Sequence, residues 1–470
     1  MGQTIALQVY LAINITLFIA GFMLNIQSVD TIIHARWVIP VVPQNSVLDD
    51  HCVVISGQKI LDILPSSEAS RMYSPKEEFK LEHHALLPGL INSHGHSAMS
   101  LFRGLADDLP LMEWLNGHIW PAEARWVDES FVADGTLLAI AEMIRSGTTC
   151  YSDMYFFPDI SAKVASEHRI RTQICFPILD FPTAWAQNSD EYIHKGLTLF
   201  DQYKHSNYVS VAFGPHAPYT VSDEPLKQVA MLSEQLGAKI QIHLHETAFE
   251  VQESIEKWGV RPLQRLADLG LLSPSLQCVH MTQIDEQDLE LLTTNGVHVI
   301  HCPESNLKLA SGFSPVDKMI KSGINVALGT DGAASNNDLD MLGEMKTAAL
   351  IAKAVANDAS AVNAHQALEM ATINGAKAMG LEETIGSLEK GKWADLIAVD
   401  LGFLDCQPVY DASSHIVYAT NSHQVTHSWI GGDIHMKDRQ LTMIDTLHLS
   451  ERVQKWAEKI KASDIDKQPI

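Results

Sequence analysis

Residues 88–96 have the sequence Pro-Gly-Leu-Ile-Asn-Ser-His-Gly-His, in which a turn precedes a short apolar run and two histidines. Before this stretch, short β-type runs separated by turn residues occupy residues 31–39, 52–55 and 59–63, with no helical segment between them. After it, short apolar runs alternate with amphipathic segments such as residues 224–236. The stretch therefore marks the start of a different kind of fold.

Eight candidate strands begin at this point, and the first of them ends at the two histidines. They occupy residues 89–94, 148–153, 171–179, 209–213, 239–244, 277–280, 297–301 and 325–329. Because helical segments lie between them, the pattern predicts an α/β fold with a (β/α)8 barrel of the TIM type rather than an open sheet. No GxGxxG motif follows the first strand, which argues against a dinucleotide-binding fold.

The segments that flank the barrel have β character. After the barrel it returns at residues 386–400 and 425–430, so we expect both ends of the chain to form one small domain. The expected domains are a β-sandwich built from residues 26–87 and 385–445, a barrel domain at residues 88–384, and a helical tail at residues 446–470.

Residues 1–25 form an apolar leader of uncertain role. Residues 5–24 carry no charge and are about long enough to cross a bilayer. The segment contains polar residues, and it lacks both a preceding Lys or Arg and a cleavage motif. We therefore favour an appendage over a membrane anchor.

Composition limits the classes of partner. The chain has 470 residues, of which 33 are Lys or Arg and 57 are Asp or Glu, so its formal net charge is −24. A field of that sign repels phosphate backbones and argues against nucleic-acid binding, but not against a small nucleoside. The six cysteines are scattered without a CxxC pair, which predicts free thiols and a reducing, cytoplasmic location.

Five residues with metal-binding or acid–base side chains stand at the ends of predicted strands. His94 and His96 end the first strand, His243 the fifth, His280 the sixth and Asp331 the eighth. One such histidine pair could arise by chance, but barrel strands all end on one face, where these residues would meet. Imidazoles together with a carboxylate suit Zn²⁺. The pattern therefore predicts a zinc site.

Several motifs resemble those of a known superfamily. The stretch at residues 88–96 and Gly329-Thr-Asp-Gly332 resemble the first-strand and eighth-strand signatures of the amidohydrolases. Within that superfamily, the chain is most similar to the methylthioadenosine/S-adenosylhomocysteine deaminases, from about residue 29 to residue 434. The matching stretches are residues 102–115, 119–123, 213–219 and 243–246.

The resemblance implies a set of metal ligands, namely His94, His96, His243 and Asp331. Many relatives hold two metals through a modified lysine at the end of the fourth strand. This chain has Gly214-Pro-His216 there, so one Zn²⁺ per subunit is expected. His245 lies two residues beyond His243 and is expected on the same strand face, in a supporting or packing role.

Three catalytic residues are implied as well. Glu246 would take a proton from the attacking water and deliver it to N1 of an adenine ring. Asp331 would carry the second proton to the leaving ammonia, and His280 would orient the attacking oxygen. Zinc would supply the acidified water.

Substrate contacts rest mainly on the same resemblance. Glu123 resembles the carboxylate that binds the ribose hydroxyls, and His216 a histidine that contacts substrate. Arg169 or Arg171 could reach the amino-acid carboxylate of S-adenosylhomocysteine. Candidates for the wall of the purine and thioether pocket are Phe102, Met112, Trp114, Leu115 and Trp120, which core packing would also explain.

The expected activity is hydrolytic deamination of an adenine nucleoside: S-adenosylhomocysteine, 5′-methylthioadenosine or adenosine, which the sequence does not rank. The alternative is another amidohydrolase of heteroaromatic rings, of the guanine deaminase or triazine hydrolase type. A metal-free binding scaffold is disfavoured, since all four proposed ligands are present together with Glu246 and His280. Related enzymes form dimers or tetramers, so a homo-oligomer is expected.

Overall fold

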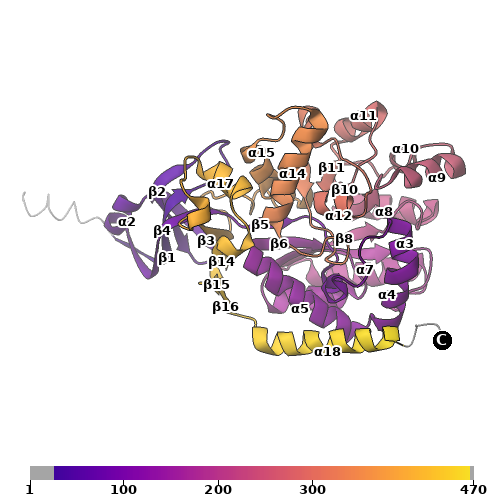
Figure 1. The fold of residues 1–470 in the computed structure, drawn as a ribbon, viewed down its shortest axis with the longest axis horizontal. Coiled ribbons are helices and arrows are strands. Elements are labelled where there is room, and N and C mark those ends of the chain that lie inside the picture. The colour runs from indigo at the N-terminus through magenta and orange to yellow at the C-terminus, as the bar shows by residue number, and fades with distance from the viewer. Residues whose placement is uncertain (1–25, 466–470) are drawn as a thin grey trace, which may run out of the picture.

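The computed structural model describes residues 26–465, which form a parallel barrel and a separate β-sheet beside it (Figure 1). The predicted fold class is therefore confirmed. The predicted leader at residues 1–25 lies outside the described residues. None of the helices between residues 26 and 465 combines the length and the apolar character that a membrane span requires.

Eight parallel strands form the barrel, each hydrogen-bonded to the next along the chain. They are β5 (Leu90–Asn92), β6 (Thr148–Asp153), β7 (Arg171–Ile178), β8 (Val209–Pro215), β9 (Ile240–Leu244), β10 (Leu276–His280), β11 (His298–His301) and β12 (Val326–Leu328). Almost every residue in them is buried, because helices cover the outer face while the inner face is packed against the other strands. The eight strands lie at the predicted runs, with small shifts at their ends.

The barrel closes where its last strand meets its first. The backbone N–H of Ser93 donates to the carbonyl of Leu328 at 2.8 Å, and that of Asp331 donates to the carbonyl of His94 at 3.0 Å. Gly329 lies in this seam, where a Cβ atom would stand only 2.7 Å from the backbone nitrogen of His94. Closure without a side chain at residue 329 therefore places the first-strand histidines against Asp331.

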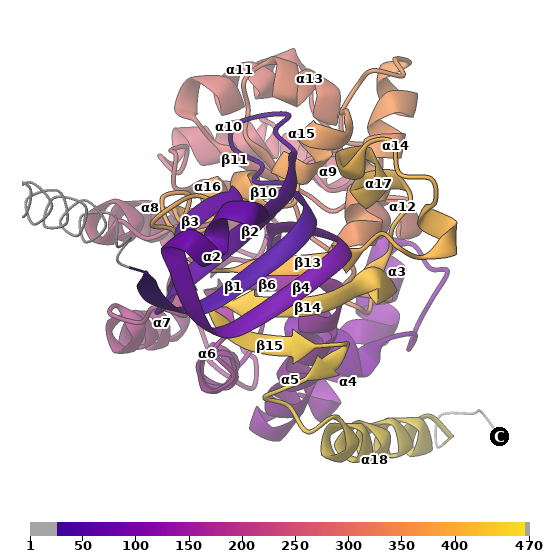
Figure 2. The ribbon, with the colours of Figure 1, turned by 90° about the vertical axis from the view of Figure 1, so that its left-hand side faces the viewer.

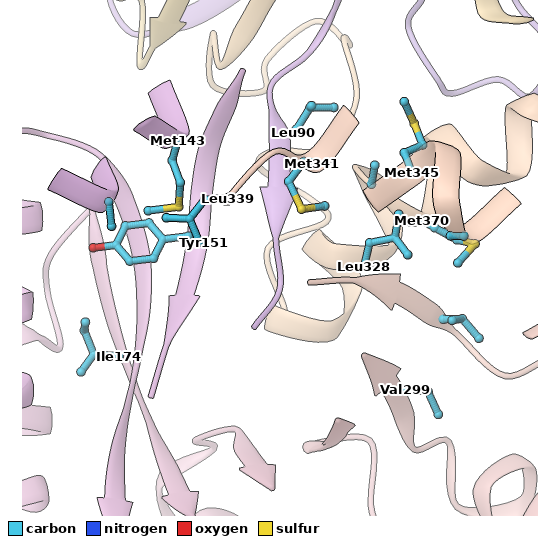
Figure 3. Close-up of a cluster of buried hydrophobic side chains, with 14 of the residues drawn as sticks. Leu90, Met143, Tyr151, Ile174, Val299, Leu328, Leu339, Met341, Met345 and Met370 are labelled. Carbon is cyan, nitrogen blue, oxygen red and sulfur yellow. The ribbon is translucent and has the colours of Figure 1, made fainter. Parts of the chain in front are cut away.

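Helices surround the barrel, and its main core lies between them and the strands. Figure 3 shows part of this core, in which Met143 from one helix lies beside Tyr151 of β6 and Met341 from another lies beside Leu90 of β5. The helices are α3 (Leu111–Trp114), α4 (Trp120–Trp126), α5 (Glu129–Ser146), α6 (Pro158–Glu167), α7 (Ser189–Tyr203), α8 (Asp223–Leu236), α9 (Ala248–Trp258), α10 (Pro262–Asp268), α11 (Glu286–Asn295), α12 (Pro303–Lys308), α13 (Val316–Lys321), α14 (Met341–Ala356), α15 (Ala364–Met370) and α16 (Ile373–Met379).

The second sheet combines both ends of the chain, as predicted (Figure 2). Its strands are β1 (Gln27–Val38), β2 (Leu48–Ser56), β3 (Lys59–Pro65), β4 (Tyr73–Pro88), β13 (Leu396–Asp400), β14 (Val425–Ile430), β15 (Asp433–Lys437) and β16 (Gln440–Leu441). β4 joins the two halves, because it pairs with β1 on one side and with β13 on the other. All eight strands belong to one hydrogen-bonded sheet.

Both faces of this sheet are buried. On β2, Val53 and Ile55 belong to one apolar cluster with Trp429. The alternate residue Val54 belongs to another cluster with Ala69 of α2 (Ser66–Met72), as the two-residue repeat of a strand requires. A further helix, α17 (Ala412–Tyr418), lies between β13 and β14 in the chain.

The predicted helical tail is α18 (Thr446–Ile465), which lies along α5 (Figure 1). The rings of Trp456 and Phe131 pack edge to face with centroids 5.3 Å apart. The indole N–H of Trp456 donates to Asp134 at 2.9 Å, and Arg452 pairs with the same carboxylate at 2.7 Å. The tail is thus attached to the barrel rather than only exposed on its surface.

One buried ion pair connects the barrel to the sheet. Arg171 is the first residue of β7, so it lies at the amino end of the barrel, opposite the end where the predicted site residues gather. Its Nη2 donates to Asp395 at 3.0 Å, and its guanidinium lies 4.5 Å from the Trp393 ring centroid. Both charged side chains are almost fully buried. This placement corrects the expectation that Arg171 contacts substrate, since its charge is already neutralised.

We expect Arg171→Met to lower the free energy of unfolding by about 3–5 kcal/mol, because it leaves the Asp395 carboxylate buried without its cation. Chemical denaturation measures the change. Arg169→Met is the matched control: Arg169 pairs with Asp433 at 3.0 Å in an exposed position, so its loss should lower stability by only about 0–1 kcal/mol. Equal effects of the two substitutions would contradict the assignment.

Candidate metal centre and active site

Four imidazoles and one carboxylate meet at the carboxyl end of the barrel. His94 and His96 follow β5, His243 lies in β9, His280 ends β10 and Asp331 follows β12. The Nε2 atoms of His96 and His94 lie 3.2 and 3.5 Å from Oδ1 of Asp331. The Nε2 atoms of His94 and His243 are 3.2 Å apart, and a ring nitrogen of His280 lies within 4.8 Å of both rings' nitrogens. The structure thus brings together all five residues that the sequence placed at strand ends.

The hydrogen bonds of these rings fit a metal ion. In three of them Nδ1 faces an oxygen that only accepts, so Nδ1 carries the proton and the lone pair of Nε2 faces the centre. The acceptors are Gln241 Oε1 for His94 at 2.8 Å, Met154 O for His96 at 2.6 Å and His216 O for His243 at 2.6 Å. Two lone pairs that face each other at 3.2 Å repel unless a cation lies between them. This donor set suits Zn²⁺.

Asp331 is held in place as an anion. Its backbone has φ 63°, in the left-handed region that Asp adopts more readily than most residues. Oδ2 accepts hydrogen bonds from Ser305 Oγ at 2.7 Å and from Ser335 Oγ at 3.1 Å. Burial alone would raise the pKa of Asp331, but positive charge in the centre opposes it: with protons on Nε2 of His94 and His96 in place of a metal ion, hydrogen bonds from these rings hold that pKa well below its usual range. The carboxylate is therefore available to a metal ion.

Glu246 and His280 lie side by side at the centre. Nε2 of His280 is 3.8 Å from Oε2 of Glu246, and Nδ1 of His280 is 2.9 Å from Oδ1 of Asn306. Oε1 of Glu246 accepts a hydrogen bond from Ser311 at 3.2 Å. Burial, together with the charge of Asp331, raises the pKa of Glu246 to about 8. A carboxyl group with a pKa in this range can both hold and release a proton near neutral pH.

His245 does not share the face of His243, contrary to the sequence-based expectation. β9 ends at Leu244, and His245 has φ 52°, which breaks the alternation of the strand. Its Nδ1 lies 3.0 Å from the carbonyl of Gln283, and its Nε2 accepts from the backbone N–H of Leu263 at 3.0 Å. Burial lowers the pKa of His245 to about 4, so the ring is neutral. It packs outside the centre.

A cavity of about 570 Å³ opens over the centre, a size suited to a small molecule. The predicted site residues that line it are His96, Trp114, Leu115, Trp120, Glu123, His216, His243, Glu246, His280 and Asp331. Phe102 does not line it, because its ring packs against Phe131 with centroids 4.7 Å apart. Met112 is exposed elsewhere, and Arg169 and Arg171 are also absent from the lining.

Glu123 is supported by a residue that the sequence analysis missed. The hydroxyl of Tyr155 donates to Oε1 of Glu123 at 2.7 Å, and burial raises the pKa of Glu123 to about 7. Tyr155 lies two residues beyond the end of β6, so its strand-end position could have indicated it. His216 lies nearby with its ring centroid 5.0 Å from that of His243, and burial with the nearby histidines lowers its pKa to about 4.

The residues that orient the centre were also missed. Gln241 precedes His243 by two residues on β9, so the two-residue repeat of a strand could have placed both side chains on one face. Ser305, Asn306 and Ser311 lie in and after α12, where no periodic signal distinguishes them from ordinary polar residues. They are recognisable only once the barrel is folded.

Comparison with known proteins identifies the family of the chain and several similar proteins. Residues 85–435 match the Amidohydrolase family, and the chain belongs to this family. It is 56% identical to the 5-methylthioadenosine/S-adenosylhomocysteine deaminase of Saccharophagus degradans over 94% of this chain and 99% of that protein. It is 40% identical to the 5′-deoxyadenosine deaminase of Methanosarcina barkeri over 92% of this chain and 98% of that protein.

A crystal structure of an adenosine deaminase from Xanthomonas campestris with bound zinc has the same fold. The two superpose with a TM-score of 0.92 at 48% identity, over 93% of this chain and all of that one. Together these similarities confirm the resemblance to methylthioadenosine/S-adenosylhomocysteine deaminases that the motifs indicate.

We expect Gln241→Leu to weaken zinc binding about 10- to 100-fold, because Nδ1 of His94 loses the acceptor that orients the ring. Competition with a chelator measures the affinity. Gln173→Leu is the matched control: Gln241 and Gln173 both bond to Gln277, at 2.7 and 3.0 Å, but the side-chain hydrogen bonds of Gln173 go to Gln277, Ser152 and Cys175 and not to a proposed ligand. An equal loss of zinc affinity in both variants would contradict the role of Gln241 as the acceptor for His94 and would attribute the loss to the buried amide network as a whole.

Proposed function

We propose that the chain is a zinc-dependent hydrolytic deaminase of adenine nucleosides. Water replaces the 6-amino group: a C6–O bond forms, the C6–N bond breaks, and the products are the inosine analogue and ammonia. The proposed zinc ligands, one ion per subunit, are His94, His96, His243 and Asp331. The observation that carries the proposal is that three of these ligands, His96, His243 and Asp331, line one cavity of nucleoside size together with Glu246 and Glu123.

The similar proteins support this assignment of substrate class. Their names describe deaminases of methylthioadenosine, S-adenosylhomocysteine, 5′-deoxyadenosine and adenosine, which share the adenine ring and the ribose. We also propose a cytoplasmic homo-oligomer; all six cysteines are buried free thiols, which supports a reducing compartment.

Proton transfer falls to two carboxyl groups of the chain. When bound, zinc lowers the pKa of a water molecule to about 7 and thus makes a nucleophile available at neutral pH. Glu246 accepts one proton of the water and delivers it to ring N1, which makes C6 electrophilic enough for attack. Asp331 passes the other proton to the amino group, which leaves as ammonia. His280 orients the attacking oxygen from beside Glu246.

Glu123 and the aromatic walls position the substrate in this proposal. The carboxylate of Glu123, fixed by Tyr155, accepts hydrogen bonds from the 2′- and 3′-hydroxyls of the ribose. Trp114 and Trp120 cover the apolar parts of the substrate, and His216 contacts it beside His243.

We expect Glu246→Gln to lower kcat by at least about 10²-fold while zinc content stays unchanged, because an amide cannot carry the proton to N1. The change in ultraviolet absorbance on converting 5′-methylthioadenosine to its inosine analogue measures the rate. Glu253→Gln, at an exposed position of the helix α9 that follows Glu246, should keep full activity. Near-normal turnover by Glu246→Gln would contradict the proposed role.

We expect Glu123→Gln to lower kcat/KM for nucleosides about 10- to 100-fold, mainly through KM, because hydrogen bonds from the ribose to a charged group are lost. Steady-state kinetics measure the change. The alternative, an enzyme for guanine or triazines, needs no ribose contact and would be insensitive to this substitution. Turnover of those rings by the wild type but not of nucleosides would establish the alternative.

A further inference from the structure

The cavity offers different chemistry to the two ends of a nucleoside. The metal centre and Glu246 form one end. Tyr155, which holds Glu123, lies beside this centre with its ring centroid 6.4 Å from that of His96. An adenine ring over the centre with its ribose at Glu123 would direct the 5′ substituent toward the remaining walls. Those walls include Leu111, Leu115, Leu179, Phe181, Pro182 and Ala184.

These walls provide no positive charge. Among the described residues that line the cavity there are three carboxylates, Glu123, Glu246 and Asp331, and there is no Lys or Arg. A substrate carboxylate placed there would lose its hydration and gain no cationic partner. An apolar substituent, by contrast, would gain from leaving water.

Three arginine and lysine side chains of the barrel are already paired with carboxylates, and Arg125, next to the lining residue Ala124, lies over the Trp126 ring at 5.1 Å from its centroid. Lys308 precedes the lining residue Leu309, but its Nζ pairs with Asp107 at 2.6 Å. Arg103 pairs with Glu142, and Arg171 with Asp395 at the other end of the barrel. Turning one of these side chains toward a substrate would break the pair that holds it.

The loop after β7 is a fixed part of the apolar wall. The Tyr192 hydroxyl bonds to Thr183 Oγ1 at 2.7 Å and to the Phe181 carbonyl at 3.3 Å, and the Thr183 N–H donates to the carbonyl of Ala186 at 2.8 Å. Phe181 nevertheless remains 43% exposed as a residue. A large aromatic ring held at the cavity with this much exposed surface favours an apolar ligand group against it.

We infer that the enzyme selects adenine nucleosides with an uncharged, apolar 5′ substituent and discriminates against S-adenosylhomocysteine, whose substituent ends in an amino acid. Phe181 and its neighbours form the 5′ subsite. This inference rests on the proposed function and ranks substrates within it.

The test compares kcat/KM of the zinc-loaded full chain for three nucleosides. 5′-Methylthioadenosine and 5′-butylthioadenosine are uncharged, and the butyl compound is similar in length to S-adenosylhomocysteine. We expect both to exceed S-adenosylhomocysteine by at least about tenfold. Comparable or better turnover of S-adenosylhomocysteine would overturn the inference, as would equally slow turnover of the butyl compound, since length rather than charge would then decide. Turnover of none of the three would instead overturn the proposed function.

A substitution tests the location of the subsite. Phe181→Arg supplies the missing cation, so it should raise kcat/KM for S-adenosylhomocysteine relative to 5′-butylthioadenosine by about tenfold or more. Phe181→Met keeps the wall apolar and should leave that ratio unchanged. An arginine variant that still deaminates 5′-methylthioadenosine but shows an unchanged ratio would contradict the placement of the 5′ substituent at Phe181.

Discussion

The backbone hydrogen bond from Asp331 N–H to the carbonyl of His94 is the constraint on which the rest of the site depends. It closes the barrel and at the same time sets the carboxylate of the eighth strand against the imidazoles of the first. Gly329 makes this approach possible, because any side chain there would collide with His94. Barrel closure and assembly of the metal centre are therefore the same structural event. The catalytic end needs no flexible loop to bring these two groups together.

Around this seam, the buried side chains of the metal centre have partners that compensate for their loss of water. Each of the three imidazoles with a fixed acceptor has its proton on the outer nitrogen, so the inner nitrogens can share a cation. Positive charge in the centre, carried by a metal ion or by protonated His94 and His96, keeps the pKa of Asp331 low, whereas burial and the charge of Asp331 raise the pKa of Glu246. Two carboxyl groups in one cavity thus differ in their affinity for protons. That difference is what a reaction with two proton transfers requires.

Much of the fold and of the centre was predictable, because barrel strands are short apolar runs and barrel chemistry lies at their ends. His94, His96, His243, His280 and Asp331 were identified by that position alone. The long strand β4 escaped, since its sequence mixes charged with apolar residues and does not resemble a buried strand. Arg171 was predicted to contact substrate although it begins its strand. Its true partner is Asp395, which is distant in sequence, so only the fold shows the pairing. Tyr155 and Gln241 could have been predicted, the first from its position at a strand end and the second from the two-residue repeat of a strand. The serines that bond to Asp331 and Glu246 follow no such sequence pattern, because only tertiary contact gives them a role.

The composite sheet has a consequence for how the protein is made. β4 pairs with β13, so Pro88 finds its partner Leu396 only after the entire barrel segment between them has been synthesised. Until then the edge of β4 that β13 will cover presents unpaired backbone groups, a state that favours association with other chains. Such distant pairing also forms slowly. A chain whose synthesis has reached only the last barrel helices would therefore contain all the metal ligands but an incomplete sheet. Chaperone binding to the open edge of β4 would be most valuable at this stage.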